Sequence, residues 1–460
     1  MRFSRRSFLG SLPAVFLPFP AAAGSSGNED LRVLTAAQDE IALLRAPAAR
    51  TAIWGFDGRM PGPLLRYKKG EEIKLRLENR LAEPVTFCCD GMRLPSAMAG
   101  FGGLTQAPIA PGQSFAYRFS PPDSGFYWYR SCVPPRSGPQ IDRGLFGPLV
   151  IDETEPPVVD HDIALIIADW GLDAGAQIDE AKDAAQVDPA SGHYVVTVDS
   201  DPAPILRDVV PGARLRLRLL SVIQSQLIFV TFIGLKPMVL AIDGQPCEAF
   251  APLRQTLPLG PGACFDVICD APERTGAHAA IVWRTGERHD RPLVFFTTSG
   301  ARRPKLPPIA SLPANPLLPS GIKLQASRRA DLIIEAMPDR SKDKPPMLPP
   351  ARHGPLLLNG KAAQEFALTP LLSVKRGTPV TLGFVNRTAI LMQVHVHGHA
   401  MRLLHDRDDG WEPYWRSRVV VPEVHVKHVA FLADTPGKWA IECQSLELEP
   451  HWLVSWFEVT

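Results

Sequence analysis

Apolar and polar residues alternate along several short stretches of the chain, which is the pattern of β-strands with one buried face. The clearest stretches follow Gly70, Gly212 and Gly377, and a similar segment that begins with apolar residues precedes each glycine. Because the three copies are separated by the length of a domain, the repeat predicts three similar domains rather than a solenoid.

A second alternating stretch closes each unit, at 109–119, 259–268 and 426–431. The first two stretches begin at a proline–glycine turn, and in all three units a further apolar or aromatic segment follows. Strand, turn and strand in this order predict antiparallel sandwiches, and no long amphipathic helix competes with them. We therefore expect an all-β fold.

Proline-rich runs at 303–320 and 338–355 are typical of extended spacers. A chain of 460 residues is also too long for one hydrophobic core. The predicted units are a signal peptide at 1–23, domains at 28–155, 160–298 and 350–460, and a proline-rich linker at 299–349.

The N-terminus combines paired arginines, Arg5 and Arg6, with a short apolar run and three alanines at 21–23. This is typical of a bacterial twin-arginine export signal. A first transmembrane helix is the alternative, but prolines interrupt the apolar run, which is also shorter than the ~20 residues that a span needs. We expect a periplasmic protein with no membrane span after signal cleavage.

The charged residues nearly cancel, at a net charge of +1, so the composition indicates neither a nucleic acid nor an anionic membrane as partner. We expect an unknown periplasmic protein partner and a monomeric chain. Seven cysteines cannot all pair with one another, so at least one is a free thiol, a ligand or an intermolecular link.

Several segments resemble a laccase-type multicopper oxidase. Those similar to its first domain are 91–100, 103–112, 128–129 and 142–150, and those similar to its third are 394–400 and 442–443. The resemblance covers nearly the whole mature chain and implies three cupredoxin-like Greek-key β-sandwich domains. In the family, a type 1 copper takes electrons from a substrate and passes them to a trinuclear copper cluster between the first and third domains, where dioxygen becomes water.

The family holds its cluster with His-x-His pairs, since imidazoles suit copper that cycles between two oxidation states. At the corresponding positions this chain has Cys88 and Asp90, Arg130 and Cys132, His395 and His397, and Glu442 and Gln444. Only the third pair is intact.

The type 1 site differs as much. The resemblance places its histidines at Met392 and Leu448 and its axial methionine at Leu453, so that only Cys443 remains. One thiolate without imidazole is not the set that holds blue copper. Glu447 matches a carboxylate linked in the family to proton delivery, a role it could keep only in an active enzyme.

In the family's geometry Asp90, Arg130 and Gln444 surround one former copper. A guanidinium and a carboxylate can satisfy each other there, so we expect a structural replacement of copper that joins the first and third domains. The other candidate ligands are Cys132, His397 and Glu442, and Cys88 with His395.

Three interpretations of these remnant ligands stay open. Thiolate, imidazole and carboxylate could bind copper or zinc at partial occupancy. Alternatively, Cys88 or Cys89 could form a disulfide with Cys132 in the oxidising periplasm. The histidines could also be relics without chemistry.

Oxygen-reducing oxidase activity is therefore not expected. The leading hypothesis is a copper-free periplasmic scaffold or binding protein without a cofactor, similar in kind to a copper-free family member that supports bacterial cell division. The alternative is a residual copper-binding oxidoreductase or a non-redox metal-binding protein. Its candidate ligands are Cys88, Cys132, His395, His397, Glu442 and Cys443.

Overall fold

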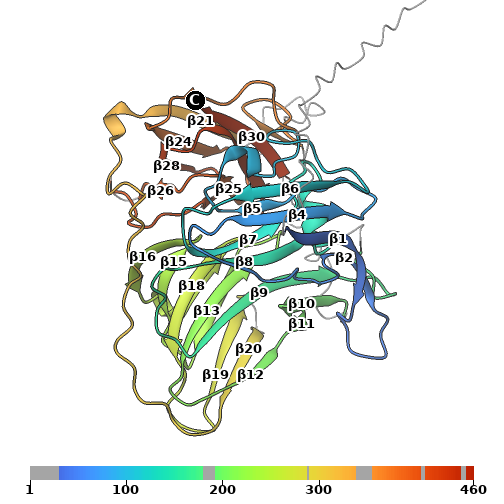
Figure 1. The fold of residues 1–460 in the computed structure, drawn as a ribbon, viewed down its shortest axis with the longest axis vertical. Helices are drawn as coiled ribbons and strands as arrows, with labels where there is room; N and C mark the ends of the chain where they lie inside the picture. Colours follow the sequence, from blue (N-terminus) through green and yellow to red (C-terminus); the bar gives the residue numbers. More distant parts are fainter. Residues whose placement is uncertain (1–30, 180–191, 287–289, 338–354, 406–409, 447–451) are drawn as a thin grey trace, which may run out of the picture. The chain divides into compact units, whose positions relative to one another are not determined.

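The computed structural model describes residues 31–179, 192–286, 290–337, 355–405, 410–446 and 452–460. The predicted signal peptide at 1–23 lies outside these residues. Within them the chain is built almost entirely of strands, which form six sheets that we group into three sandwiches (Figure 1). None of the described helices has the length and apolar character required to cross a bilayer. The prediction of an all-β fold with three cupredoxin-like sandwiches is confirmed.

The first sandwich contains the sheets β2-β1-β4-β6 and β3-β8-β7-β5. Its strands are β1 (Arg32–Ile41), β2 (Thr51–Phe56), β3 (Leu65–Lys68), β4 (Ile73–Asn79), β5 (Cys88–Asp90), β6 (Ser114–Phe119), β7 (Gly125–Arg130) and β8 (Phe146–Asp152). The 3₁₀ turn η1 (Ser96–Met98) and the helix α1 (Ser137–Asp142) lie in its loops.

The second sandwich pairs a seven-stranded sheet, β11-β10-β9-β13-β18-β15-β16, with the five-stranded sheet β12-β20-β19-β14-β17. Its elements are β9 (His161–Gly171), β10 (Tyr194–Val198), β11 (Asp201–Pro202), β12 (Ile205–Val209), β13 (Arg214–Ser221), β14 (Ile228–Ile233), β15 (Met238–Ile242), β16 (Gln245–Phe250), η4 (Leu253–Gln255), β17 (Thr256–Leu259), β18 (Cys264–Asp270), β19 (His278–Arg284) and β20 (Arg291–Thr298).

The third sandwich contains the sheets β22-β21-β24-β28-β26 and β23-β30-β29-β25-β27. Its elements are η5 (Leu324–Ala326), β21 (Arg328–Ala336), β22 (Leu356–Leu358), β23 (Ser373–Val374), β24 (Thr378–Asn386), β25 (Met392–Val396), β26 (Arg402–Leu403), β27 (Arg418–Val421), β28 (Val426–Ala433), β29 (Gly437–Ser445) and β30 (Trp452–Val459).

The third sandwich begins before residue 350, where the sequence placed its start. Strand β21 lies inside the predicted linker 299–349, yet it pairs in parallel with β24 along its length. The stretch Arg328–Ala336 has no proline and carries buried Leu332 and Ile334, so it can form a strand between two proline-rich runs.

The repeated glycines mark the same turn in each sandwich. Gly70, Gly212 and Gly377 have φ angles of +73 to +82°, which residues with a Cβ rarely adopt, and an alternating strand follows each. In the second copy both faces of β13 are buried, although the alternation of apolar and polar residues predicts one buried face. Arg216 and Arg218 are buried because both pair with Asp266.

Each sandwich has its own apolar core, and the core of the third continues into the first. The cluster around Trp439 and Phe457 also contains Phe101, Cys88 and Cys132 of the first sandwich. The first and third sandwiches are therefore packed against each other at the edge where β5 and β7 meet β25 and β29.

Candidate functional site

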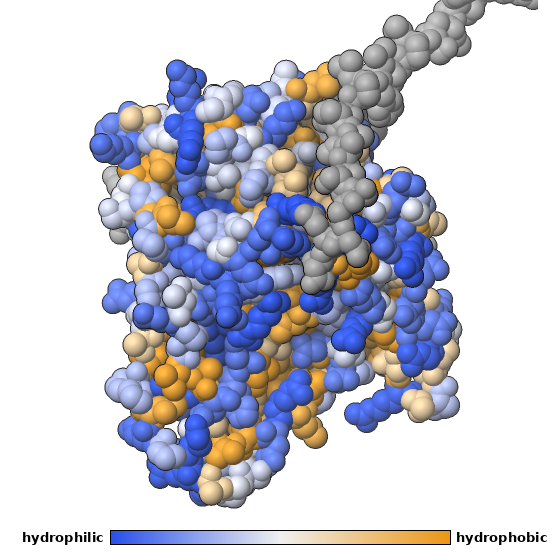
Figure 2. All heavy atoms as spheres, viewed as in Figure 1, coloured by the Kyte–Doolittle hydropathy of each residue, from blue (hydrophilic) through white to orange (hydrophobic). Residues whose placement is uncertain are grey.

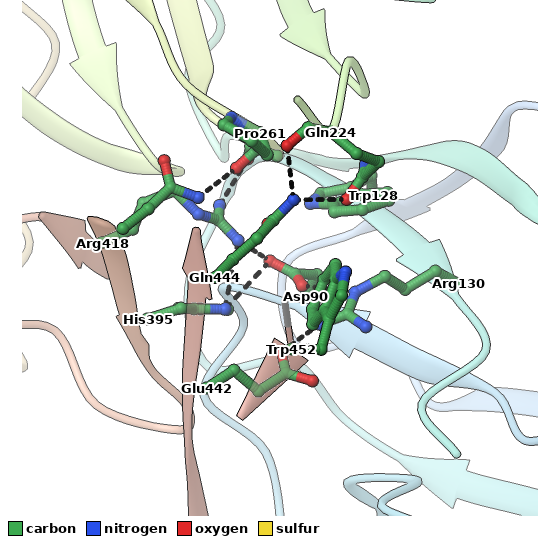
Figure 3. Close-up of a pocket in the computed structure, with 12 residues that line it drawn as sticks. Asp90, Trp128, Arg130, Gln224, Pro261, His395, Arg418, Glu442, Gln444 and Trp452 are labelled. Carbon is green, nitrogen blue, oxygen red and sulfur yellow. Dashed lines mark hydrogen bonds and ion pairs between the residues drawn. The ribbon is translucent and has the colours of Figure 1, made fainter. Parts of the chain in front are cut away.

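Strand alternation brings the predicted site residues to one interface. On β5 and β7, Cys88 lies opposite Arg130 and Asp90 opposite Trp128. On β25 and β29, His395 lies opposite Glu442. Residues two apart on a strand share a face, so these side chains converge between the first and third sandwiches (Figure 3). We call the following six buried residues the charged site: Asp90, Arg130, His395, His397, Arg418 and Glu442.

Arg130 joins the first and third sandwiches. Its Nε donates to Oδ2 of Asp90 at 2.8 Å, and its Nη2 donates to Oε2 of Glu442. Its guanidinium also lies over the rings of Trp128 and Trp452, at 5.4 and 5.5 Å from their centroids. A buried arginine with two carboxylate partners and two aromatic neighbours has most of its donors satisfied.

Arg418 is a second guanidinium in the site that the sequence did not predict. It begins β27, donates through Nη2 to Asp90 and through Nη1 to the carbonyl of Gly262 in the second sandwich. The same Nη2 lies 3.2 Å from Nδ1 of His395. An arginine directly before the apolar run 419–421 is the only sequence signal that could have pointed to it.

Both carboxylates of the charged site are ionised at neutral pH. Burial alone would raise the pKa of Asp90, but the charge of Arg418 and then that of Arg130 hold it well below the usual range. For Glu442, Arg130 and His397 likewise outweigh burial and lower the pKa. With both guanidinium groups charged, the two positive and two negative groups cancel.

The hydrogen-bond partners of the two histidines determine which ring nitrogen carries a hydrogen. Burial and then the charge of Arg418 hold the pKa of His395 well below its usual value, so its imidazole is neutral. Because Arg418 donates to Nδ1, the proton of that imidazole is on Nε2. Nε2 of His397 lies 2.8 Å from Oε2 of Glu442, and because an ionised carboxylate can only accept, Nε2 of His397 donates this hydrogen bond.

Cys88 and Cys132 lie beside Arg130 as a pair of thiols. Both are buried and hydrogen-bonded to each other, and burial is the main reason why the pKa of each is raised. All seven cysteines, Cys89 included, are free thiols in the structure. The side chain of Cys89 points to the opposite face, into the core of the first sandwich.

Gln444 lines the same cavity as Asp90 and Arg130, but the hydrogen bonds of its amide go to another residue. Its amide donates to the backbone carbonyl and the side-chain oxygen of Gln224, at 2.7 and 3.0 Å, and so binds the third sandwich to the second. The predicted proton-relay residue Glu447 lies outside the described residues, as does Leu448.

A small cavity of about 20 Å³ adjoins the charged site (Figure 3). This volume suits about one water molecule. Its lining includes Gln224, Pro261 and Gln393. Two polar atoms beside it, Nε2 of His395 and Oε1 of Glu442, have no protein partner within the described part of the chain. The cavity can therefore hold a water that completes their hydrogen bonding.

The position to which the resemblance assigns the type 1 copper is apolar. Cys443 on β29 lies opposite Val394 on β25 and Leu453 on β30, and Met392 is buried in the same core. Burial raises the pKa of the Cys443 thiol, so it is protonated and unreactive at neutral pH. We call Met392, Cys443 and Leu453 the apolar site.

Comparison with known proteins identifies the family. Family models described as multicopper oxidase match residues 39–156 and 341–460. The multicopper oxidase MmcO of Mycobacterium tuberculosis is 26% identical over 496 residues, which covers 96% of this chain and 94% of MmcO. The cell division protein FtsP of Proteus mirabilis is 24% identical over 306 residues, covering 59% of this chain and 61% of FtsP.

Solved structures agree with the sequence matches. A multicopper oxidase from Pseudomonas thermotolerans is 25% identical and superposes with a TM-score of 0.77, covering 93% of this chain and 98% of that protein. The family models together match more than half of the chain. The two matched segments contain most of the first and third sandwiches. This chain belongs to the multicopper oxidase family.

Proposed function

We propose that this protein is a copper-free member of the family and acts as a scaffold or binding protein in the periplasm rather than as an oxidase. The observation that carries the proposal is the pair of buried guanidinium groups, Arg130 and Arg418, at the interface to which the resemblance assigns the copper cluster.

Charge is the first argument. The guanidinium groups already neutralise Asp90 and Glu442, and a divalent ion among the same carboxylates would add two uncompensated positive charges to a buried site. Such charge is strongly unfavourable away from water. The charged site is therefore electrostatically complete without metal.

The available lone pairs are the second argument. A histidine binds copper through an unprotonated ring nitrogen. In the charged site Nδ1 of His395 accepts from Arg418 and Nε2 of His397 donates to Glu442, so neither of these two nitrogens is free to bind copper. Neither the charged site nor the apolar site thus offers the family's ligand set.

A scaffold role fits what these residues do in place of binding copper. Arg130 joins the first sandwich to the third, Arg418 joins the third to the first and second, and Gln444 joins the third to the second. Buried polar contacts between domains favour one arrangement over others. The protein thereby presents a fixed outer surface, as a binding protein requires.

One relative supports a role other than oxidase activity. FtsP is named a cell division protein rather than an oxidase, so the family includes members with a different role. We extend a role of that kind to this chain by similarity, which supports the class of function and not a particular partner.

Oxygen consumption tests the proposal. The exported protein, supplied with copper during production, is incubated with a phenolic laccase substrate, with a multicopper oxidase such as MmcO as positive control. We expect no oxygen uptake above that of the heat-treated sample. Uptake comparable to the control enzyme would contradict the proposal.

Export by the twin-arginine route is the other part of the proposal. Arg5 and Arg6 stand before Ser-Phe-Leu, as this route requires. Replacing both by lysine should leave the precursor in the cytoplasm of a bacterial host, as cell fractionation would show. Unchanged secretion of the double variant would rule out this route.

A non-redox metal site is the second candidate function. Ligand atoms of Asp90, His395, His397 and Glu442 all lie within 4.8 Å of one another. Zinc binding there would require both guanidinium groups to move away. Equilibrium dialysis against zinc, with Glu442→Gln as control, decides between the candidates: one zinc per chain that is lost in the variant favours the metal site, and no binding favours the scaffold.

A further inference from the structure

The second sandwich carries an apolar row on the outer face of the sheet β12-β20-β19-β14-β17. Cross-strand partners follow one another along this row, from Leu206 to Phe295, Ala280 and Ile233. The residues that alternate with them, such as Val294, point into the sandwich core. The row therefore faces away from the core.

Three side chains of this row are exposed, and the small Ala280 between them is 8% exposed. Leu206 is 75%, Ile233 46% and Phe295 37% exposed, and Phe229, on the same face of β14, is 45% exposed. Figure 2 shows hydrophobic residues reaching the visible surface over the lower part of the molecule, where Figure 1 places the second sandwich. The solvent face of an antiparallel sheet is normally polar, and a contiguous apolar patch on it marks an interaction surface.

Opposite charges flank the row at its two sides. Asp208, two residues after Leu206 on the edge strand β12, is exposed on the same face. Beyond the other side lie two exposed basic residues, Lys236, which follows β14, and Arg254 in η4, which packs beside β14. The face is thus acidic at one edge and basic near the other.

We propose that a second copy of this chain covers this face in a two-fold symmetric dimer. A two-fold axis parallel to the strands, between β20 and β19, reverses the strand order in the second copy. It places Phe295 over the small Ala280 of the second copy and Leu206 over its Ile233. It also brings Asp208 toward the basic edge of the second copy, so size and charge are both self-complementary.

The area of this sheet face indicates how tightly the dimer associates. Five strands about 4.8 Å apart and four to eight residues long cover roughly 20 by 25 Å. Two such faces form an interface at the low end of the range for specific association. The dimer is therefore concentration-dependent and takes the place of the monomer expected from the sequence.

Sedimentation velocity over a series of protein concentrations tests the dimer. The wild-type mass should rise toward twice that of the chain, and Leu206→Asp or Phe295→Asp should weaken association about 30-fold or more, as loss of a central apolar contact does. The matched control is Leu368→Asp, since Leu368 is fully exposed elsewhere on the molecule. It should leave the dimer unchanged.

Charge reversal tests the two-fold arrangement. Asp208→Lys should weaken the dimer, and adding Lys236→Glu in the same chain should restore it in part. A protein that stays monomeric at every concentration, a dimer insensitive to the patch variants, or failure of the second charge change to restore association would overturn the proposal. Copper content of the same samples reports separately on the proposed function.

Discussion

The charged site and the apolar site occupy opposite faces of one sheet. On β25 and β29, His395 and Glu442 point toward the first sandwich, whereas Val394 and Cys443, their neighbours in sequence, point into the core of the third. The resemblance to the family assigns a copper position to each face, and in this structure one face is a network of ion pairs and the other is ordinary apolar packing.

The difference follows from what surrounds each face. The charged site lies between domains, where strands from both contribute polar groups, and these buried groups need partners. The apolar site lies within one sandwich, where a hydrocarbon side chain can fill the same volume. The comparison predicts that the first site is sensitive to loss of charge and the second only to loss of volume.

Removing Arg130 should have the largest effect. Arg130→Ala leaves Asp90 and Glu442 buried with less compensation, and it should lower the free energy of unfolding by roughly 3–5 kcal/mol, as when one partner of a buried ion pair is lost. Urea denaturation measures the change. The matched control is Arg80→Ala, because Arg80 pairs with Glu78 at the surface and should contribute at most about 1 kcal/mol. Equal losses of unfolding free energy in the two variants would contradict the prediction that the charged site contributes more than a surface ion pair.

Truncating the apolar site should have the next largest effect. Leu453→Ala opens a cavity next to Cys443 and should lower the free energy of unfolding by roughly 2–5 kcal/mol. Because no charge is exposed or stranded, the loss should be the same at low and high salt in urea denaturation. A strong salt dependence would show that this face is not simply apolar.

Acid should weaken the fold through a buried histidine of the third sandwich. His399 contacts Phe431 and Trp439, and burial lowers its pKa from 6.5 to about 4. Below pH 6.5 the unfolded chain binds this proton and the native chain does not, so stability falls as pH falls, by up to about 1.4 kcal/mol per pH unit.

The histidine variant isolates that slope. His399→Gln should flatten the dependence of the unfolding free energy on pH between pH 6.5 and about pH 5. The pKa of His395 is also lowered, so His395 still makes the unfolding free energy of the variant fall as the pH falls. An unchanged slope in the variant would assign the acid sensitivity to other groups.

Restoring one family residue to the apolar site should have the smallest effect. Leu453→Met conserves volume and should cost less than about 1.5 kcal/mol. The variant should still show no blue absorption band after copper addition, since both histidine positions of that site lack imidazole. A blue band would show that the face retains a copper geometry.

Much of the fold could be predicted because each sandwich repeats the same local chemistry. The alternating stretches after Gly70 and Gly377 became β4 and β24, with the expected buried positions. The start of the third sandwich could not be predicted, because β21 pairs in parallel with a strand some fifty residues later and no local pattern records that partner.

The contacts of the charged site were likewise predictable only in part. The contact between Asp90 and Arg130 could be predicted, because both residues stand at ligand positions that meet in the family's geometry. Arg418 occupies no such position, and only the packing of three sandwiches brings it to Asp90. Gln444 was assigned to the same cluster, yet its amide finds a nearer partner in Gln224 of the second sandwich.

Copper content is the most direct test of the claim that guanidinium groups stand where the family holds its cluster. Wild-type protein, exported from copper-supplemented cells and dialysed without chelator, would be measured by elemental analysis and absorption spectroscopy beside a multicopper oxidase. We predict far less than one copper per chain and no blue band. A full complement of copper with a blue band would contradict the account.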